Sequence, residues 1–289
     1  MNGIKDFNCS YDNSVGINEA VTKELNLKFP EAYKYGESMA DIAKALKKHD
    51  GADFCELPFC HTVEAEAMGG LVNYGNDKIG PRAKEYICTD IEELLELPEI
   101  DYSKGRIHEV LLACRHLREQ GENVVLEVAG PFTILNVLID ARYVFKGMRK
   151  KPEVMKKVYE KFEKEILRYI KEAQKYGVNL ISYADSSGGV NILGPKIAEQ
   201  VVEEFTYPFL KEVETLVGDS AIVLLCPKTT FALLGTSKAE FEDVELEEPM
   251  KYGQGCIHLI GKEKFAGQMC IKNIGYRLES KKIKVVKLL

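Results

Sequence analysis

Acidic, thiol and imidazole side chains stand directly after several mostly apolar segments of this sequence. Asp185 and Cys226 each follow such a segment, and Cys60 and His61 follow another. If these segments are parallel strands, their carboxyl ends lie at one edge of a sheet, where α/β folds carry their chemistry. Thiolate and imidazole groups are ligands that zinc prefers. The sequence therefore predicts one site at this edge, with metal binding among its possible functions.

Asp185 and Cys226 also have plain structural interpretations. Asp185 precedes Gly188 and Gly189, whose lack of side chains lets a ligand approach the backbone closely. An aspartate at such a position can equally cap a helix or a loop. Cys226 follows an apolar run and can be a small core residue. Residue type alone leaves both interpretations open.

Further candidates lie after the first strand-like segment and in the C-terminal part. Glu64 and Glu66 fall in a short helical stretch, where one can be solvated and the other can turn toward a cavity. Cys256 and His258 are two residues apart, so they share a face if they lie on a strand. Two residues do not make a site, and core packing is the competing interpretation.

Strand-like and helical segments alternate over most of the chain and must position these residues. Helical spacing of apolar residues marks 106–120 and 152–177. The strand-like segments are Gly51–Glu56, Val124–Val128, Val178–Tyr183 and Ala221–Leu225. Helices between short apolar strands indicate parallel strands with crossover connections. The predicted fold class is therefore α/β.

A closed barrel is favoured over an open dinucleotide-binding sheet, because no GxGxxG follows the first strand. The alternation becomes compressed after Cys226. Further strands are predicted at Phe241–Leu246, Cys256–Ile260, Phe265–Ile271 and Ile283–Leu289. We therefore predict a (β/α)8 TIM barrel with a compressed C-terminal half, formed as one domain by residues 1–289.

Composition excludes several classes of protein. The 289 residues carry a net charge of −6, with acidic and basic side chains interspersed, so no basic stripe indicates a nucleic-acid partner. No apolar run has the length of a membrane span, and the polar N-terminus lacks a secretory signal. The sequence predicts a soluble cytoplasmic protein that does not bind membranes, with its eight cysteines reduced.

Three short motifs, in order, resemble the uroporphyrinogen decarboxylase superfamily. Residues 57–70 (LPFCHTVEAEAMGG) resemble the segment near the first strand of its corrinoid-dependent methyltransferases. Residues 128–133 (VAGPFT) are similar to the superfamily's Gly-Pro-Phe-Thr segment. Asp185 and the LGP at 193–195 resemble its strand-end aspartate and the proline before its next helix. The resemblance extends from about residue 38 to residue 217.

The resemblance implies a TIM barrel and, in the methyltransferase branch, a zinc ion at the strand ends. A His-x-Cys pair and a later cysteine hold this zinc, which keeps a thiol substrate as thiolate for attack on a methyl-corrinoid. Cys226 and Cys270 match the two cysteines, but Leu224 stands at the histidine position. The candidates to complete the metal site are His61, His258 and Glu64.

The expected function is therefore zinc-assisted transfer of a methyl group between a corrinoid and a thiol or another small acceptor. Asp185 is the expected catalytic residue, and the expected substrate contacts are His61, Glu64, Thr133 and Tyr183. A small-molecule substrate and a corrinoid protein are the expected partners.

Two alternatives remain. Decarboxylation of a tetrapyrrole would need several cationic side chains for its carboxylates, and no arginine occurs in residues 1–35. The other alternative is a catalytically silent barrel that binds a small molecule or a corrinoid protein. The leucine at position 224 favours this silent barrel, whereas Asp185, Cys226 and Cys270 favour methyl transfer.

Overall fold

The computed structural model describes residues 3–9 and 15–289, and a seven-stranded sheet organises this part of the chain. Its parallel strands are, in spatial order, β1 (Cys55–Leu57), β4 (Val124–Ala129), β5 (Leu180–Ala184), β6 (Ile222–Leu225) and β8 (Phe265–Ala266). Two antiparallel strands, β9 (Lys282–Leu288) and β7 (Ala239–Glu245), continue the sheet. The predicted α/β class with parallel strands is confirmed.

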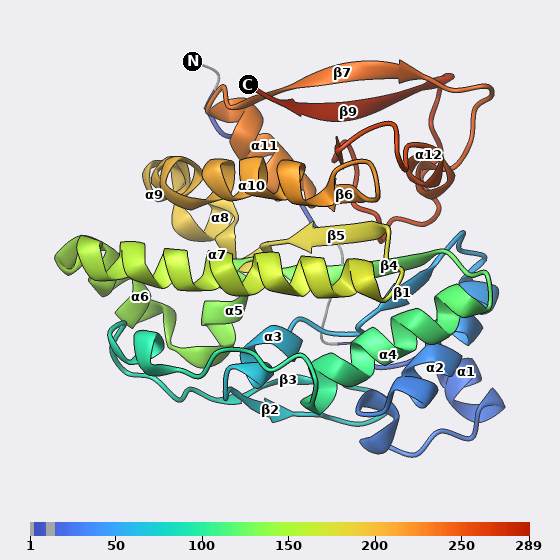
Figure 1. Ribbon diagram of the computed structural model, residues 1–289, viewed down its shortest axis with the longest axis horizontal. Coiled ribbons are helices and arrows are strands. Elements are labelled where there is room, and N and C mark those ends of the chain that lie inside the picture. Colours follow the sequence, from blue (N-terminus) through green and yellow to red (C-terminus); the bar gives the residue numbers. More distant parts are fainter. Residues whose placement is uncertain (1–2, 10–14) are drawn as a thin grey trace.

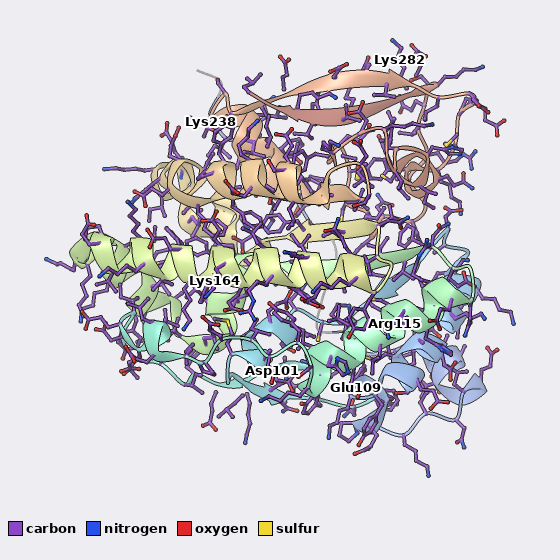
Figure 2. The ribbon with its side chains drawn as sticks, in the orientation of Figure 1. Asp101, Glu109, Arg115, Lys164, Lys238 and Lys282 are labelled. Carbon is purple, nitrogen blue, oxygen red and sulfur yellow. The ribbon has the colours of Figure 1, made fainter. Side chains whose placement is uncertain are left out.

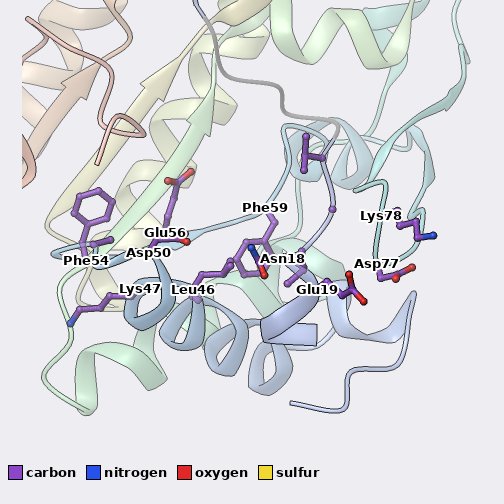
Figure 3. Close-up of a pocket in the computed structure, with 15 residues that line it drawn as sticks. Asn18, Glu19, Leu46, Lys47, Asp50, Phe54, Glu56, Phe59, Asp77 and Lys78 are labelled. Atoms are coloured by element: carbon purple, nitrogen blue, oxygen red, sulfur yellow. The ribbon is translucent and has the colours of Figure 1, made fainter. Parts of the chain in front are cut away.

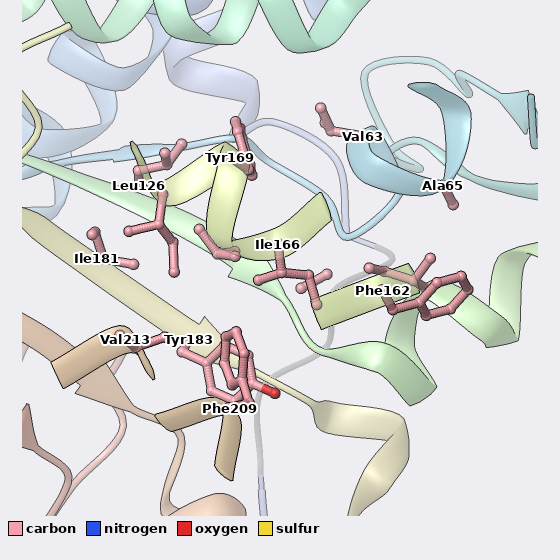
Figure 4. Close-up of a cluster of buried hydrophobic side chains, with 14 of the residues drawn as sticks. Val63, Ala65, Leu126, Phe162, Ile166, Tyr169, Ile181, Tyr183, Phe209 and Val213 are labelled. Atoms are coloured by element: carbon pink, nitrogen blue, oxygen red, sulfur yellow. The ribbon is translucent and has the colours of Figure 1, made fainter. Parts of the chain in front are cut away.

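Amphipathic helices cover one face of this sheet (Figure 1). They are α2 (Gly36–Asp50), α4 (Gly105–Glu119), α7 (Pro152–Lys175) and α10 (Tyr207–Val217). In α7, Phe162, Ile166 and Tyr169 recur at helical spacing and are buried. They pack in one core with Leu126 of β4 and Ile181 of β5 (Figure 4). The period of the apolar residues thus fixes which side of each helix meets the sheet.

The opposite face of the sheet carries a second apolar cluster. Val125, Leu180 and Leu224 point to this side because side chains alternate along a strand. Tyr252 and Cys256 of α12 (Tyr252–His258) pack against them. We call this side the inner face, since the C-terminal part of the chain covers it.

A proline interrupts the helical stretch between β5 and β6. The stretch consists of α9 (Pro195–Val201), a π-helical turn at Val202–Thr206, and α10. Pro208 lies in the first turn of α10 and has no N–H to donate to the preceding turn. The wider π turn just before it is a usual way to accommodate such a lost bond.

The remaining elements are short. The helices are α1 (Glu19–Glu24), α3 (Val63–Ala67), α5 (Pro131–Leu138), α6 (Ala141–Lys150), α8 (Val190–Leu193) and α11 (Pro227–Gly235), with 3-10 turns at Glu31–Tyr33, Glu93–Glu96 and Ser186–Gly188. Strands β2 (Leu71–Asn73) and β3 (Arg82–Glu85) form a separate antiparallel pair. Within residues 3–9 and 15–289, no helix combines the length and apolar character needed to cross a membrane.

The C-terminal part differs from the prediction in one element. Segment 256–260 was expected to be a strand, but Tyr252, Cys256 and Leu259 lie in and just after helix α12. Their spacing of four and three residues is helical, and the short apolar run conceals it. The strand predicted at 265–271 shortens to Phe265–Ala266, whereas β7 and β9 match their predicted segments closely.

The sheet of the described residues is open in its hydrogen bonding. The strand order begins with β1 and ends with β7, and no backbone hydrogen-bond ladder among the described residues joins these two edge strands. An antiparallel pair thus stands where a complete barrel would have its last parallel strands. After β6 the regular alternation of parallel strands and helices ends, because β8 is short and β9 and β7 pair as an antiparallel ribbon.

Charged side chains of both signs cover the outside, as Figure 2 shows for Lys164 on α7, Lys282 on β9 and Asp101 before α4. Many form surface ion pairs, such as Lys164 Nζ with Glu99 Oε1 at 2.5 Å. Such exposed pairs contribute little to stability. The charges that matter for a site are the buried ones.

Candidate functional site

Four charged or titratable side chains meet on the inner face, and we call them the charge cluster: Glu56, His61, Glu127 and Lys272. Lys272 Nζ lies 2.8 Å from Glu56 Oε1 and 2.8 Å from Glu127 Oε2. His61 Nδ1 lies 3.0 Å from the other Glu127 oxygen, Oε1. The Glu127 side chain is 2% exposed and that of His61 11%. The cluster is therefore a buried polar group at the border of the apolar core.

Strand register brings these side chains together. Glu56 pairs with Val125 of β4, and Glu127 pairs with Ser182 of β5. Because residues two apart share a face, Glu127 points to the same inner side as Val125. Lys272 follows the short strand β8, and its side chain reaches back to β1 and β4.

Glu127 and Lys272 were not among the residues selected from the sequence. The available signal was a single glutamate within the apolar strand VVLEVA. A carboxylate is rarely buried unless a partner accompanies it. The sequence indicated neither partner, because Lys272 lies 145 residues away and His61 lies in a different loop.

The charge cluster fixes the protonation of its two glutamates in opposite directions. Burial alone would raise the pKa of Glu127, but the neighbouring His61 and Lys272 lower it to about 2. Burial raises the pKa of Glu56; Lys272 opposes this shift and Glu127 adds to it. Glu127 is consequently the carboxylate that carries the permanent negative charge.

Glu64 and Asp185 lie within electrostatic reach of His61. Glu64 on α3 is buried and accepts a 2.7 Å hydrogen bond from the Ala129 amide through Oε1. Burial nevertheless raises its pKa. The structure thus brings three of the predicted site residues, His61, Glu64 and Asp185, to one region.

Asp185 binds the first turn of α5. Its Oδ1 accepts hydrogen bonds from the Thr133 amide at 2.8 Å and the Thr133 hydroxyl at 3.0 Å. Its Oδ2 accepts a longer bond of 3.4 Å from the Phe132 amide. Gly130 permits this approach, since a Cβ there would lie 2.4 Å from the Asp185 Cβ. Asp185 therefore acts as an N-terminal cap for a helix that is distant in sequence.

Burial raises the pKa of Asp185 from 3.8 to about 6, although the Thr133 and Phe132 donors oppose this shift. A carboxyl whose pKa is raised on folding stabilises the protein at low pH, and this contribution is lost as pH rises through about 6. For Asp185→Asn, we expect the unfolding free energy, variant minus wild type, to rise by up to about 3 kcal/mol between about pH 4 and pH 7, at roughly 1.4 kcal/mol per pKa unit. Urea unfolding at several pH values measures this difference, and a constant difference over the range contradicts the assignment.

The two cysteines of the zinc prediction lie near each other. Cys226 is the N-cap residue of α11, and Cys270 follows β8. Burial raises the pKa of the Cys226 thiol to about 11 and that of Cys270 to about 12, and a charge on Cys226 further raises the pKa of Cys270. Cys9, which sequence reasoning did not select, affects the pKa of both thiols. Its segment lies along α11, where the Phe7 and Phe231 rings are 6.0 Å apart.

These thiols do not complete a three-ligand zinc site. In the part of the chain that the structure describes, no group of three or more His, Cys, Asp or Glu side chains is arranged to hold a metal ion. Leu224, two residues before Cys226, is 2% exposed and packs in the inner apolar cluster. His258 is exposed on α12 and lines a separate depression with Glu247 and Lys262. The described ligand set therefore does not fit the zinc centre that the resemblance implies.

The other predicted substrate contacts are buried. Tyr183 is 1% exposed, and its ring packs on Phe209 with centroids 5.2 Å apart. Thr133 is 4% exposed and is bound to Asp185. Both border Gly130 and the site edge rather than open space. Their roles toward a substrate stay predictions.

Cys60 is held beneath the site by a buried guanidinium. Arg106 of α4 donates to Cys60 Sγ at 3.1 Å, to Thr62 Oγ1 at 2.6 Å and to Glu66 Oε2 at 2.6 Å. Glu66 also accepts a hydrogen bond from the Tyr74 hydroxyl. The loop that carries His61 is thus anchored on both sides of the histidine.

A cavity of about 600 Å³ opens beside β1 (Figure 3). Glu56 of β1 and the preceding Phe54 line it together with Phe59 and with Leu46 of α2. Its volume is in the range of small-molecule sites. Through Glu56 this cavity touches the charge cluster, whereas the predicted residues Asp185, Cys226 and Cys270 do not line it.

Residues 15–255 match the family model described as uroporphyrinogen decarboxylase (URO-D), and the chain belongs to this family. Its similarity to particular members points to the methyltransferase branch. It is 25% identical over 228 residues to the methylcobamide:CoM methyltransferase MtaA of Methanosarcina barkeri, covering 78% of this chain and 66% of that protein. It is 21% identical to the methylcobamide:CoM methyltransferase MtbA of Methanosarcina acetivorans, covering 76% of this chain and 65% of that protein. The family and branch expected from the motifs are confirmed.

A solved methyltransferase from Methanosarcina mazei shares the fold. Its TM-score to this chain is 0.62 at 21% identity, with 75% of this chain and 65% of the other covered. The matched part of the chain thus spans about two thirds of the length of its relatives.

Proposed function

We propose that this chain transfers a methyl group between a corrinoid and a small thiol. Relatives named methylcobamide:CoM methyltransferases match 76–81% of the chain at 21–25% identity, which supports this class of reaction. The observation that carries the proposal is that Cys270 lies within electrostatic reach of both Cys226 and Lys272, so the two cysteines border the charge cluster after the ends of β6 and β8. This edge is where α/β enzymes place their chemistry.

In the proposed reaction the protein must bind the thiol and accept its proton. The sulfur of the thiol forms a bond to the methyl carbon, and the cobalt–carbon bond breaks with its electron pair remaining on cobalt, so Co(III) becomes Co(I). The thiol proton must go to a base, because the thiolate is the nucleophile. A buried site with titratable side chains can hold the thiol and remove this proton. We propose three residues for this site. Asp185 positions helix α5, and His61 and Glu64 contact the substrate.

Zinc assistance is the finer part of the expected mechanism, and the described donors support it only partly. Cys226 and Cys270 could contribute two thiolates, and zinc bound there would lower the pKa of a thiol substrate. Leu224 offers no donor in place of the expected histidine.

Replacing Leu224 by histidine tests the descent of this site from a three-ligand centre. Position 224 lies on the inner face two residues before Cys226, so Leu224→His adds an imidazole close in sequence to a thiol. We expect the purified variant to bind about one zinc per chain, as a site with three protein ligands does. Elemental analysis after dialysis measures the zinc, and Leu224→Asn is the control of similar polarity. Equal zinc content in both variants contradicts a latent third-ligand position.

Two further parts of the picture are proposals. We propose that residues 1–289 act as one domain whose sheet is a shortened (β/α)8 barrel, and that a corrinoid protein can dock at its carboxyl edge. Decarboxylation of a tetrapyrrole is less supported, because the first arginine of the chain is Arg82. A substrate with many carboxylates requires several such cations.

A spectroscopic assay tests the proposed function. Methylcobalamin and ethanethiol are mixed anaerobically with the purified chain, and the methylcobalamin absorbance and ethyl methyl sulfide are followed together. We expect loss of methylcobalamin with an equal yield of the thioether, at a rate above that without protein. No acceleration with any small thiol, or with the reverse pair of substrates, would count against methyl transfer.

A further inference from the structure

His61 and Glu127 form a buried imidazole–carboxylate pair. Nδ1 and Oε1 lie 3.0 Å apart, and neither atom has a hydrogen-bond partner of standard geometry among the described residues. This distance is that of a hydrogen bond, so only the direction of the N–H bond differs from standard geometry. A small rotation of the imidazole ring would align the two groups. Because buried polar atoms rarely remain unpaired, each atom is the natural partner of the other.

The rest of the charge cluster holds this pair in place. Lys272 binds the second oxygen of Glu127 at 2.8 Å and keeps that carboxylate ionised and fixed in direction. Glu56 accepts the other contact of Lys272, also at 2.8 Å. A carboxylate that binds Nδ1 sets the tautomer of the imidazole, so that Nε2 is the atom able to accept a proton.

The position of His61 suits contact with a substrate. Its side chain is more exposed than that of Glu127, 11% against 2%, so the ring lies between the buried carboxylate and the edge of the site. The other carboxyls within its electrostatic reach are Glu56, Glu64 and Asp185.

From this geometry we propose that His61 is the general base that removes the proton from the acceptor thiol, and that Glu127, Lys272 and Glu56 are residues that position it. The inference rests on the proposed methyl transfer. The S–H bond breaks, its proton passes to His61 Nε2, and the resulting thiolate attacks the methyl carbon of the corrinoid. A base of this kind would supply the thiolate without the third metal ligand that Leu224 replaces.

The test uses two thiols of similar size and different acidity, ethanethiol and trifluoroethanethiol. We expect His61→Asn to lower the rate with ethanethiol about 10²–10⁴-fold, the usual contribution of a general base. The rate with trifluoroethanethiol, which ionises far more easily, should fall much less. The control is His49→Asn, which removes a histidine–carboxylate contact with Asp50 at the surface. This variant should change neither rate. Equal losses with both thiols, or no loss, overturn the assignment.

A second readout does not require methyl transfer. Bound ethanethiol should show the ultraviolet absorbance of a thiolate at neutral pH in the wild type, and His61→Asn should lose this band. Glu127→Gln should weaken it, while Glu127→Asp should restore part of it. If the band appears but methylcobalamin is not consumed, His61 remains the base and the methyl donor in the proposed function is wrong. A band that persists in His61→Asn overturns the base assignment, and wild-type protein without band or transfer overturns both proposals.

Discussion

Replacing Lys272 by methionine should lower the free energy of unfolding by about 3–5 kcal/mol at neutral pH, the usual cost of removing one partner of a buried ion pair. Lys272 bridges Glu56 and Glu127, and its own side chain is only 10% exposed. Methionine is similar to the lysine stem in length and flexibility, but it leaves the two carboxyls without the ammonium group that bridges them. Chemical denaturation at pH 7 measures the loss.

The loss should depend on pH in a defined direction. In the wild type the pKa of Glu127 is about 2, below its ordinary value of 4.5, so its contribution to stability is present above that ordinary value and is lost as pH falls toward 2. In Lys272→Met the folded-state pKa values of Glu56 and Glu127 should rise, so that their ionisation opposes folding. The deficit of the variant should therefore be largest at neutral pH and shrink as the solution is acidified.

Lys284→Met is the matched control. Lys284 pairs with Asp243 at 2.7 Å on β7, but its side chain is half exposed, so its removal should change stability by less than about 1 kcal/mol. If the two lysine variants lose similar stability, or if the Lys272→Met deficit does not vary with pH, the charge cluster is not the coupled buried group described above.

Replacing Arg106 by methionine should cost a similar amount, about 3–5 kcal/mol, because Glu66 would lose its buried cation and Thr62 and Cys60 their donor. The Arg106 side chain is 4% exposed, against 21% for Glu66. Since these contacts fix the loop on both sides of His61, we also expect weaker order in that loop. Denaturation and amide hydrogen exchange of residues 60–66 would show the two effects.

Arg115→Met on the same helix is the control for this variant. Arg115 is exposed and lies over the Tyr176 ring at 4.1 Å, a contact that contributes less than about 1 kcal/mol at the surface. Equal stability of the Arg106 and Arg115 variants, with unchanged exchange in residues 60–66, would contradict an anchoring role for Arg106.

The parallel half of the fold could be predicted from local pattern. The apolar segments at 124–128, 178–183 and 221–225 lie within two residues of β4, β5 and β6, because buried parallel strands appear as short apolar runs. The strand predicted at 256–260 was wrong, because a short apolar run does not distinguish a strand from a buried helix. Closure of a β-barrel depends on pairing between strands that are far apart in sequence, and a local sequence pattern does not predict this pairing.

The candidate site could be predicted in part. His61, Asp185 and Cys226 were selected because they follow predicted strands, and residue type and position after a strand are local properties. Cys270 was selected by resemblance. The sequence also offered capping as an alternative for Asp185, and the Thr133 contacts show that geometry. The charge cluster depends on contacts such as Lys272 with Glu127, 145 residues apart, which one sequence cannot reveal. The glutamate within β4 was the one local sign that such a partner existed.

The structure and the relatives together narrow the chemistry. The chain belongs to the URO-D family and is similar to corrinoid methyltransferases, while Leu224 stands where one metal ligand was expected. The charge cluster places titratable groups on the inner face of the sheet. A thiol that loses its proton to His61 would reconcile the proposed methyl transfer with the leucine at position 224.

The most direct measurement of the central claim follows an isotopically labelled methyl group. Methylcobalamin carrying the label is incubated with the purified chain and ethanethiol under anaerobic conditions, and the product is analysed by mass spectrometry. Our account predicts labelled ethyl methyl sulfide in an amount equal to the Co(I) corrinoid formed, at a rate that depends on the protein. Label that remains on cobalt, at the same rate as without protein, would contradict it.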